Sequence, residues 1–193
     1  MAKGDLRSPE FKKINPSMQI PALTEGDFKL SQSHSILKYL HKSRGCADHW
    51  YPSDPKKRSI IDQDLDWHHS NLRKGSYQQL RKRFILPLFG IEPNESELAE
   101  LDKLLHKSLR LMDKTLKYSK YCCGDQINIV DLSLGTEINS LTPLGTDMSK
   151  YPYVQQWMKR LEEIPEVKNI FDNMSVPFLE GNNTSAKMIL SKI

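Results

Sequence analysis

The sequence predicts a small α/β unit followed by an all-α domain, and three observations support this fold class. Residues 15–40 read as an extended segment, a turn, a second extended segment and a helix. From Asp54 onward apolar residues recur at helical spacing along most of the chain. His49-Trp50-Tyr51-Pro52-Ser53, between the two parts, is typical of a linker. We therefore expect the α/β part over residues 1–45, the linker over 46–53, the helical domain over 54–175 and a loosely held tail over 176–193.

The α/β part is predicted to begin with a short helix and a hairpin. Ser8-Pro9-Glu10 combines a hydroxyl cap, a first-turn proline and an acid, and Asn15-Pro16 ends the helix. The apolar run from Met18 to Leu23 contains Pro21, which cannot donate to a ladder, so we expect an edge strand or a special role for the proline. Glu25-Gly26-Asp27 indicates the turn. Apolar and polar residues alternate in Phe28-Lys29-Leu30, as expected of a short second strand with one buried face.

A helix is expected directly after the hairpin. Ser31-Gln32-Ser33 offers hydroxyl groups where that helix begins, and Arg44-Gly45 marks its end. The helix N-terminus should lie beside the strand that contains Pro21. Because unpaired N–H groups and the positive end of the helix dipole meet there, the pattern predicts an anion-binding site.

The second part is predicted to consist of helices with recognisable starts. Asp54-Pro55 begins the first, and its apolar face combines Ile61, Leu65, His68 and Leu72. We expect Gly75 to bend or break this long helix and Pro87 to end it. The later helices begin at a capping box, Asn94-Glu95-Ser96-Glu97, and at two proline-containing segments, Lys150-Tyr151-Pro152 and Ile164-Pro165.

The strongest single motif runs from Cys122 to Leu132, with the sequence CCGDQINIVDL. Asn128 can cap a helix, and Asp131 can accept a hydrogen bond from the N–H of the cap residue itself. The apolar flanks indicate a buried helix start, where unpaired N–H groups are costly, rather than the alternative of a surface capping box. We therefore expect Asn128 and Asp131 to act in folding rather than in catalysis.

Composition and charge exclude several classes of function. The net charge is +4, and the basic clusters Lys56-Lys57-Arg58 and Arg81-Lys82-Arg83 lack interleaved aromatic residues, so we expect solvated helix faces and no nucleic-acid binding. No apolar run is long enough for a membrane span, and no signal peptide is visible, so a cytoplasmic protein is expected. Three cysteines without disulfide or zinc spacing predict reduced thiols. Adjacent side chains on a helix point in different directions, so His68-His69 predicts no metal site.

Most of the chain, from Lys3 to about Phe171, resembles the glutathione transferases, and its flanking segments look most like the theta class. The resemblance rests on the Ile20-Pro21-Ala22-Leu23 strand with its Gly-Asp turn, on Gln32-Ser33 at a helix start, and on the capping motif at Asn128. The theta-like segments are Lys3-Gly4, Pro9-Glu10-Phe11, Ile14-Asn15-Pro16 and Trp50-Tyr51-Pro52. This resemblance implies an incomplete thioredoxin-like N-terminal domain and an all-helical C-terminal domain of the transferase type.

The resemblance also implies a glutathione site within the hairpin region. Ile20 would offer its backbone N–H and C=O to the cysteinyl part of glutathione, with the bond before Pro21 in the cis form. Gln32 and Ser33 would hold the γ-glutamyl carboxylate at the helix N-terminus, although the family usually has an acid where Gln32 stands. Gln19 stands where theta enzymes often have lysine.

Two arginines complete the expected ligand contacts. Leu6 stands where a histidine often binds the glycyl carboxylate, and Arg7, next to it, can substitute. Arg73 matches an arginine that theta enzymes direct at the ligand cleft; a solvated helix arginine is the alternative. No cofactor is implied beyond glutathione as co-substrate.

The activity implied is attack of glutathione thiolate on a small electrophile. Family members begin with a strand–helix–strand unit that carries the catalytic serine of theta enzymes, and this sequence starts after it, so we expect no catalytic residue in this chain and impaired activity. A homodimer, which the family usually forms, should be weakened for the same reason. A non-catalytic interaction module of glutathione-transferase type and a bare helical domain with a vestigial hairpin are the alternatives, and glutathione binding separates the first hypothesis from both.

Overall fold

The computed structural model describes residues 5–179, which divide into two compact units. Residues 5–50 belong to the first unit and residues 51–179 to the second. The boundary falls inside the linker predicted over 46–53. Lys3-Gly4 and most of the tail predicted over 176–193 lie outside the described residues, while residues 176–179 belong to the last helix.

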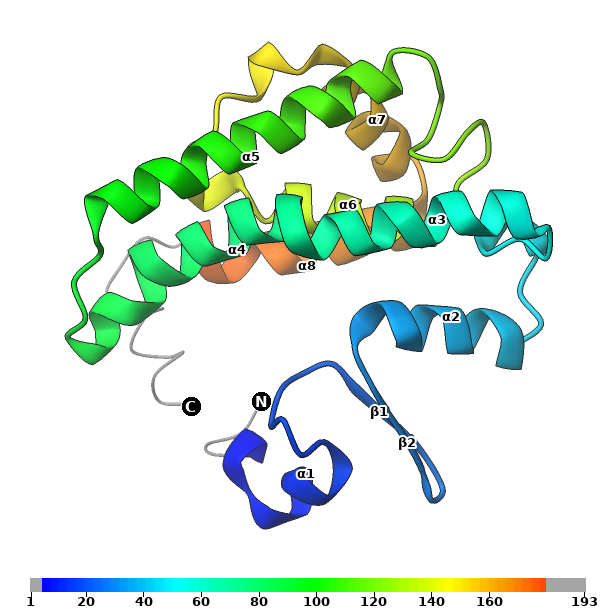
Figure 1. The fold of residues 1–193 in the computed structure, drawn as a ribbon, viewed down its shortest axis with the longest axis horizontal. Coiled ribbons are helices and arrows are strands. Elements are labelled where there is room, and N and C mark those ends of the chain that lie inside the picture. Colours follow the sequence, from blue (N-terminus) through cyan, green and yellow to red (C-terminus); the bar gives the residue numbers. More distant parts are fainter. Residues whose placement is uncertain (1–4, 180–193) are drawn as a thin grey trace. The chain divides into compact units, whose positions relative to one another are not determined.

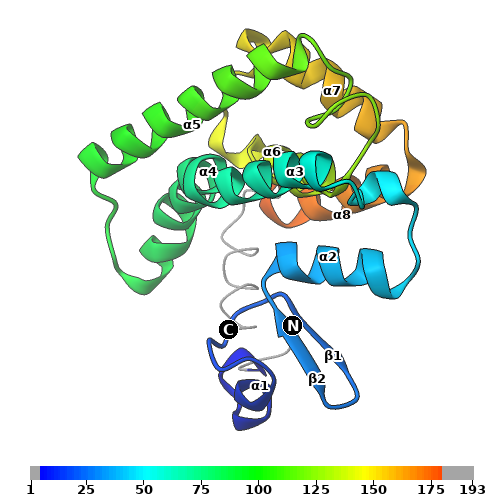
Figure 2. The same cartoon turned by 45° about the vertical axis from the view of Figure 1, so that its right-hand side comes forward.

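The first unit is a β-hairpin with helical segments before and after it. Strands β1 (Ala22–Glu25) and β2 (Phe28–Ser31) pair antiparallel, with Ala22 opposite Ser31 and Glu25 opposite Phe28. The helical elements of this unit are η1 (Asp5–Arg7), α1 (Pro9–Ile14), α2 (Ser33–Ser43) and η2 (Asp48–Trp50). The hairpin passes directly into α2, as Figure 2 shows.

Side-chain contacts hold α2 against the hairpin. Tyr39 on α2 donates to Glu25 Oε2 at 2.6 Å, and Arg44 forms an ion pair with the same carboxylate. The Phe28 and Tyr39 rings lie 4.9 Å apart between centroids. The hydrogen bond from Tyr39, followed by the Arg44 contact, lowers the pKa of Glu25. These contacts hold the C-terminal half of α2 against the turn end of the hairpin.

The second unit is all-helical, and none of its helices within the described residues combines the length and hydropathy of a membrane span. Helix α6 packs against α3, α4, α7 and α8, and α5 packs against α4 and α7 (Figure 1). Val130, Val154 and Trp157 are fully buried where these helices meet. The elements are α3 (Pro55–Trp67), η3 (His68–Leu72), α4 (Arg73–Leu80), η4 (Arg81–Ile85), η5 (Leu86–Phe89), α5 (Glu95–Leu116), α6 (Ile129–Asn139), η6 (Thr142–Leu144), η7 (Met148–Lys150), α7 (Pro152–Glu162) and α8 (Pro165–Leu179).

The sequence predicted a bend or a break at Gly75, and the break does not occur. Gly75 lies inside α4, and the helix continues through two π-helical turns, η3 and η4, into the 3-10 turn η5. Pro87 lies within η5, so the helical path ends at Gly90, which has a φ of 74°. The glycine has a packing role, because a Cβ at Gly75 would lie 2.7 Å from the backbone nitrogen of Leu105 on α5.

Replacement of Gly75 with alanine should therefore destabilise the helical unit, although alanine is the better helix former. The added Cβ meets backbone atoms, which cannot move aside as a flexible side chain can, so we expect a loss of about 1–3 kcal/mol in the free energy of unfolding. Urea denaturation measures this loss. Lys74→Ala, at the preceding position of α4, which is exposed, is the control and should stay within about 0.5 kcal/mol of the parent. A Gly75→Ala variant as stable as the parent would contradict the close approach of α4 and α5.

Candidate functional site

The hairpin brings four of the predicted site residues to one end of the first unit. Because Ala22 pairs with Ser31, the residues before Ala22 and those after Ser31 leave the sheet at the same end. Ile20 and Pro21 therefore lie at the end where Gln32 and Ser33 open α2. Ile20, Pro21 and Gln32 are exposed and Ser33 is half-buried. The Ile20–Pro21 peptide bond is cis, as the resemblance implied.

The loop before Ile20 is held by Asn15, the residue at the end of α1. Asn15 is 5% exposed, and its Nδ2 donates to the carbonyl oxygen of Gln19 at 2.6 Å. Its Oδ1 accepts from the N–H and the hydroxyl of Ser17, at 3.1 and 2.8 Å. Met18 takes a φ of 55° within this turn. Asn15 thereby sets the path of the backbone that leads to Ile20, while the side chain of Gln19 remains exposed.

The entry to α2 differs from the hydroxyl cap that the sequence predicted. The helix begins at Ser33, and the N-cap residue is Gln32, whose side chain makes no capping hydrogen bond. Gln32 has φ 74° and ψ 117°, a conformation that residues with a Cβ adopt at a cost and that is found mainly at functional sites. The first turn also contains no acidic residue. This helix start is therefore suited to an external anion.

The second predicted group, Asn128 and Asp131, is brought together inside the helical unit. Asn128 Oδ1 accepts from the N–H of Val130 at 2.9 Å, and Asp131 Oδ2 accepts from the N–H of Asn128 at 2.9 Å, which makes a complete capping box. Asp131 Oδ1 also accepts from the N–H of Cys122 and from Trp157 Nε1, each at 2.8 Å. Burial raises the pKa of Asp131, although these donors act in the opposite direction. Both residues are buried, so the motif joins α6, α7 and the loop before α6.

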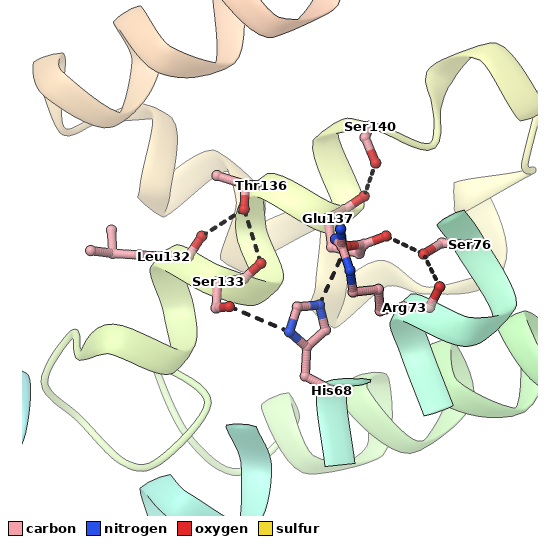
Figure 3. A network of polar contacts seen from close by, with 8 residues as sticks. All are labelled: His68, Arg73, Ser76, Leu132, Ser133, Thr136, Glu137 and Ser140. Atoms are coloured by element: carbon pink, nitrogen blue, oxygen red, sulfur yellow. Dashed lines mark hydrogen bonds and ion pairs between the residues drawn. The ribbon is translucent and has the colours of Figure 1, made fainter. Parts of the chain in front are cut away.

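Arg73, a predicted ligand residue, belongs to a buried polar network in the helical unit (Figure 3). Its Nη1 lies 2.6 Å from Glu137 Oε2, and its guanidinium lies 4.9 Å from the centre of the Tyr77 ring. The Glu137 carboxylate also accepts from the Ser76 hydroxyl and lies 3.4 Å from His68 Nε2. The Glu137 side chain is 4% exposed, whereas that of Arg73 is 43% exposed. One edge of the guanidinium is thus fixed on α6 while much of it remains accessible.

The charge state of Glu137 follows from these partners. Burial favours the neutral acid, but hydrogen bonds from His68 and Ser76 and the positive charge of Arg73 outweigh it and lower the pKa of Glu137. Glu137 was not identified from the sequence, because its partners Ser76 and Arg73 on α4 are 61 and 64 residues away.

The π-turn η3 explains how His68 and Arg73 reach the same carboxylate. The N–H of Arg73 bonds the carbonyl oxygen of His68, which places residues i and i+5 on one side of the helix. In an α-helix the two side chains would diverge by about 140°. His68 is buried as predicted, with Nδ1 3.3 Å from Ser133 Oγ. The expectation that His68 and His69 point apart is wrong, since their rings are stacked at 5.5 Å in this turn.

Arg7 is exposed in η1. The three cysteines are free thiols, and no group of three metal-ligating side chains occurs within residues 5–179. The structure thus shows a helix start without a side-chain cap in one unit, and in the other an arginine that is paired with a buried glutamate and remains partly exposed.

Comparison with known proteins places both units in one family. The model of the glutathione S-transferase N-terminal domain matches residues 1–42, and that of the C-terminal domain matches residues 67–165. Glutathione S-transferase T1 of Arabidopsis thaliana is 39% identical over 172 residues, which cover 84% of this chain and 70% of that protein. Glutathione S-transferase theta-1 of Homo sapiens is 34% identical, over 84% of this chain and 69% of that protein. The match to Arabidopsis thaliana glutathione S-transferase T3, at 40% identity, spans 27% of that longer protein.

Solved structures agree. A human theta-class glutathione transferase in complex with the glutathione conjugate of 1-menaphthyl sulfate superposes with a TM-score of 0.87 at 28% identity, covering 98% of this chain and 78% of that one. The apo form of human glutathione-S-transferase T1-1 gives 0.82 at 28% identity, covering 97% and 82%.

Proposed function

Because the chain belongs to the theta class of the glutathione S-transferase family, we propose that it binds glutathione and takes part in its conjugation to electrophilic small molecules. The observation that supports this most is the uncapped start of α2, where the hairpin places Gln32 and Ser33 at the same end as Ile20. Glutathione carries a γ-glutamyl carboxylate, and such a helix start binds an anion through free N–H groups and the helix dipole.

In this proposal each hairpin residue contacts a different part of glutathione. The backbone of Ile20 pairs with the cysteinyl part, and Gln32 and Ser33 hold the γ-glutamyl carboxylate. Gln19 and Arg7, both exposed, interact with the glycyl end. Gln32 is neutral where an acid could pair with the γ-glutamyl amine, so a moderate affinity is expected.

The conjugation step joins the glutathione sulfur to an electrophilic carbon while the leaving group departs with the bonding electrons. The thiolate is the reactive form, so the thiol needs a hydrogen-bond donor or a positive charge to lower its pKa. We assign no residue in this chain to that task, since Ser31 and Ser33 lie at the γ-glutamyl end. Arg73, whose guanidinium is partly exposed, is proposed to contact an anionic group of the second substrate. A homodimer and a cytoplasmic location remain predictions.

The Ser33→Ala variant tests the glutathione site. Loss of one hydrogen bond to the carboxylate should weaken glutathione binding, measured by titration calorimetry, by about 1–3 kcal/mol. Ser35→Ala, an exposed serine two residues along the same helix, is the matched control and should bind as the parent does. Equal affinity in both variants would contradict the assignment of Ser33. A parent chain that does not bind glutathione would contradict the proposed function and favour a non-catalytic interaction module.

A further inference from the structure

The solvent-facing side of α5 carries a row of positive charges that the proposed function does not use. Its members follow one another at intervals of three and four residues, which places them on one side of the helix: Lys107, Arg110, Lys114 and the C-cap residue Lys117. All four are exposed, whereas Leu109 and the other buried residues of α5 lie on the opposite side. Both views show α5 at the outer edge of the helical unit (Figures 1 and 2). We call this row the basic stripe.

The carboxylates near the basic stripe are engaged elsewhere. Asp113 lies within the stripe in sequence, but its Oδ1 accepts from the N–H groups of Tyr153 and Val154 at the start of α7, at 2.8 and 3.1 Å. Glu100, on the turn before the stripe, pairs with Lys103 at 2.7 Å. Within residues 5–179 none of the four cations of the stripe forms an ion pair with a carboxylate. The stripe therefore presents uncompensated positive charge to solvent.

The stripe continues toward α7 and ends beside an exposed aromatic ring. Arg160 of α7 donates from Nε to the carbonyl oxygen of Lys120 at 3.1 Å, so these two residues add their charges at the C-terminal end of the stripe. Tyr118 is 78% exposed, and Lys117 Nζ lies 5.5 Å from the centre of its ring. Tyrosine combines an apolar ring with a polar tip and is enriched where a protein meets the polar region of a membrane.

Helix stability does not explain the basic stripe. Like charges three or four residues apart on a helix repel one another and destabilise it. Interaction with the negative end of the helix dipole accounts for Lys114 and Lys117, which are in or next to the last turn, but not for Lys107 and Arg110. Neighbouring positions lie about 5–6 Å apart between Cβ atoms, within the Debye length of about 8 Å at physiological salt, so their potentials add.

The shape and composition of the stripe favour a flat partner with diffuse negative charge. The stripe covers ten residue steps and therefore extends about 15 Å along the convex side of a helix. Three of its four members are lysines, which are compact, strongly hydrated charges and do not bind planar groups in the bidentate way that arginine does. The headgroups of anionic phospholipids form such a surface and attract clustered basic residues.

We propose that the basic stripe binds the surface of membranes that contain anionic phospholipids, with α5 parallel to the surface and Tyr118 at the level of the headgroups. Each lysine or arginine near such a surface strengthens binding by a factor of about five. The attachment is peripheral. It involves none of the residues assigned to glutathione and depends on neither glutathione binding nor conjugation.

The test is co-sedimentation of the full chain with phosphatidylcholine vesicles that contain or lack phosphatidylserine, at an ionic strength of about 0.15 M. The chain should bind the phosphatidylserine vesicles at least about tenfold more tightly, since about two basic residues in contact suffice for this difference. Salt at about 1 M, which shortens the Debye length to about 3 Å, should release it, and saturating glutathione should leave binding unchanged. Equal binding to the two kinds of vesicle, or binding that salt does not weaken, would overturn the proposal.

Two double variants of equal net charge locate the contact. Lys107→Glu with Lys114→Glu reverses the charge at the centre of the stripe and should weaken binding to phosphatidylserine vesicles at least about twentyfold, about fivefold for each cation lost. Lys56→Glu with Lys57→Glu, exposed at the start of α3, is the matched control and should stay within about threefold of the parent. Lys107→Arg with Lys114→Arg keeps both charges and should bind as the parent does.

Equal weakening in the two glutamate variants would show that net charge alone attracts the chain to the vesicles, and would overturn the assignment to the basic stripe. Tighter binding to polyglutamate than to phosphatidylserine vesicles at the same ionic strength would assign the stripe to an acidic protein, and would overturn the membrane proposal.

Discussion

Asp131→Ala is expected to lower the free energy of unfolding of the helical unit by at least about 3 kcal/mol. The Asp131 side chain is fully buried and accepts hydrogen bonds from three donors, the N–H groups of Cys122 and Asn128 and the indole nitrogen of Trp157. Each buried donor left without a partner costs about 1–3 kcal/mol, and alanine leaves all three without one. The indole of Trp157 is itself fully buried, so water cannot replace the lost acceptor without entry into the core.

Urea denaturation followed by far-UV circular dichroism measures this loss. Asp147→Ala is the matched control, because Asp147 also accepts a hydrogen bond from a backbone N–H at a helical start but is exposed, as the N-cap of η7. That control should lose about 1 kcal/mol or less, as surface caps do. Similar losses in the two variants would mean that the Asp131 motif acts as an ordinary surface cap.

Glu137→Ala is expected to destabilise the same unit by about 3–5 kcal/mol. Removal of one partner from a buried ion pair leaves the other uncompensated, and here Arg73, Ser76 and His68 all lose their shared acceptor. The partial exposure of Arg73 lets water solvate its charge, so the lower end of the range is expected. Glu97→Ala removes a carboxylate of similar chemistry from a surface pair with Lys82 and should change stability by about 1 kcal/mol or less.

The pH dependence gives an independent measure of the Glu137 contribution. The pKa of Glu137 is lower in the folded protein than its ordinary value of 4.5. Its ionised form therefore stabilises the fold fully above about pH 4.5, and this contribution is lost as the pH falls through the folded-state pKa. The difference in unfolding free energy between the parent and Glu137→Ala should thus be constant near neutral pH and shrink below pH 4.5. A difference that grows toward acid pH would contradict the ionised network.

The elements that sequence predicted well are those that depend on nearby residues. Ser8, Asp54 and Asn128 each cap a helix through a backbone group within three residues, so the signal is complete within one turn. The hairpin register follows from the Gly26 turn and the short strands that flank it, and it places Ile20 and Ser33 at the same end of the hairpin.

The features that sequence did not predict depend on partners far along the chain or on backbone geometry. Gly75 was expected to bend or break the helix, because the reason for the glycine, the close backbone of Leu105, lies thirty positions away on another helix. Glu137 carries no local pattern that distinguishes it from a surface glutamate. Gln32 was predicted beside a hydroxyl cap, whereas its positive φ directs the chain into α2 without one. The role of Asn15 in holding Gln19 also depends on a loop fold that spacing alone does not specify.

The π-turn at residues 68–72 has a consequence for the whole length of the helix that contains it. In an uninterrupted α-helix each residue is turned by a fixed angle from the one before it. The side that packs against α6 near Leu65 would therefore determine the side that faces α5 near Gly75. The wider π-turn changes the rotation of the helix between these two residues. One continuous helix can therefore pack against both α6 and α5, which approach it from different directions. Packing against both neighbours fixes the number of residues between Leu65 and Gly75. Insertion or deletion of one residue there would rotate one half of the helix away from the helix it packs against.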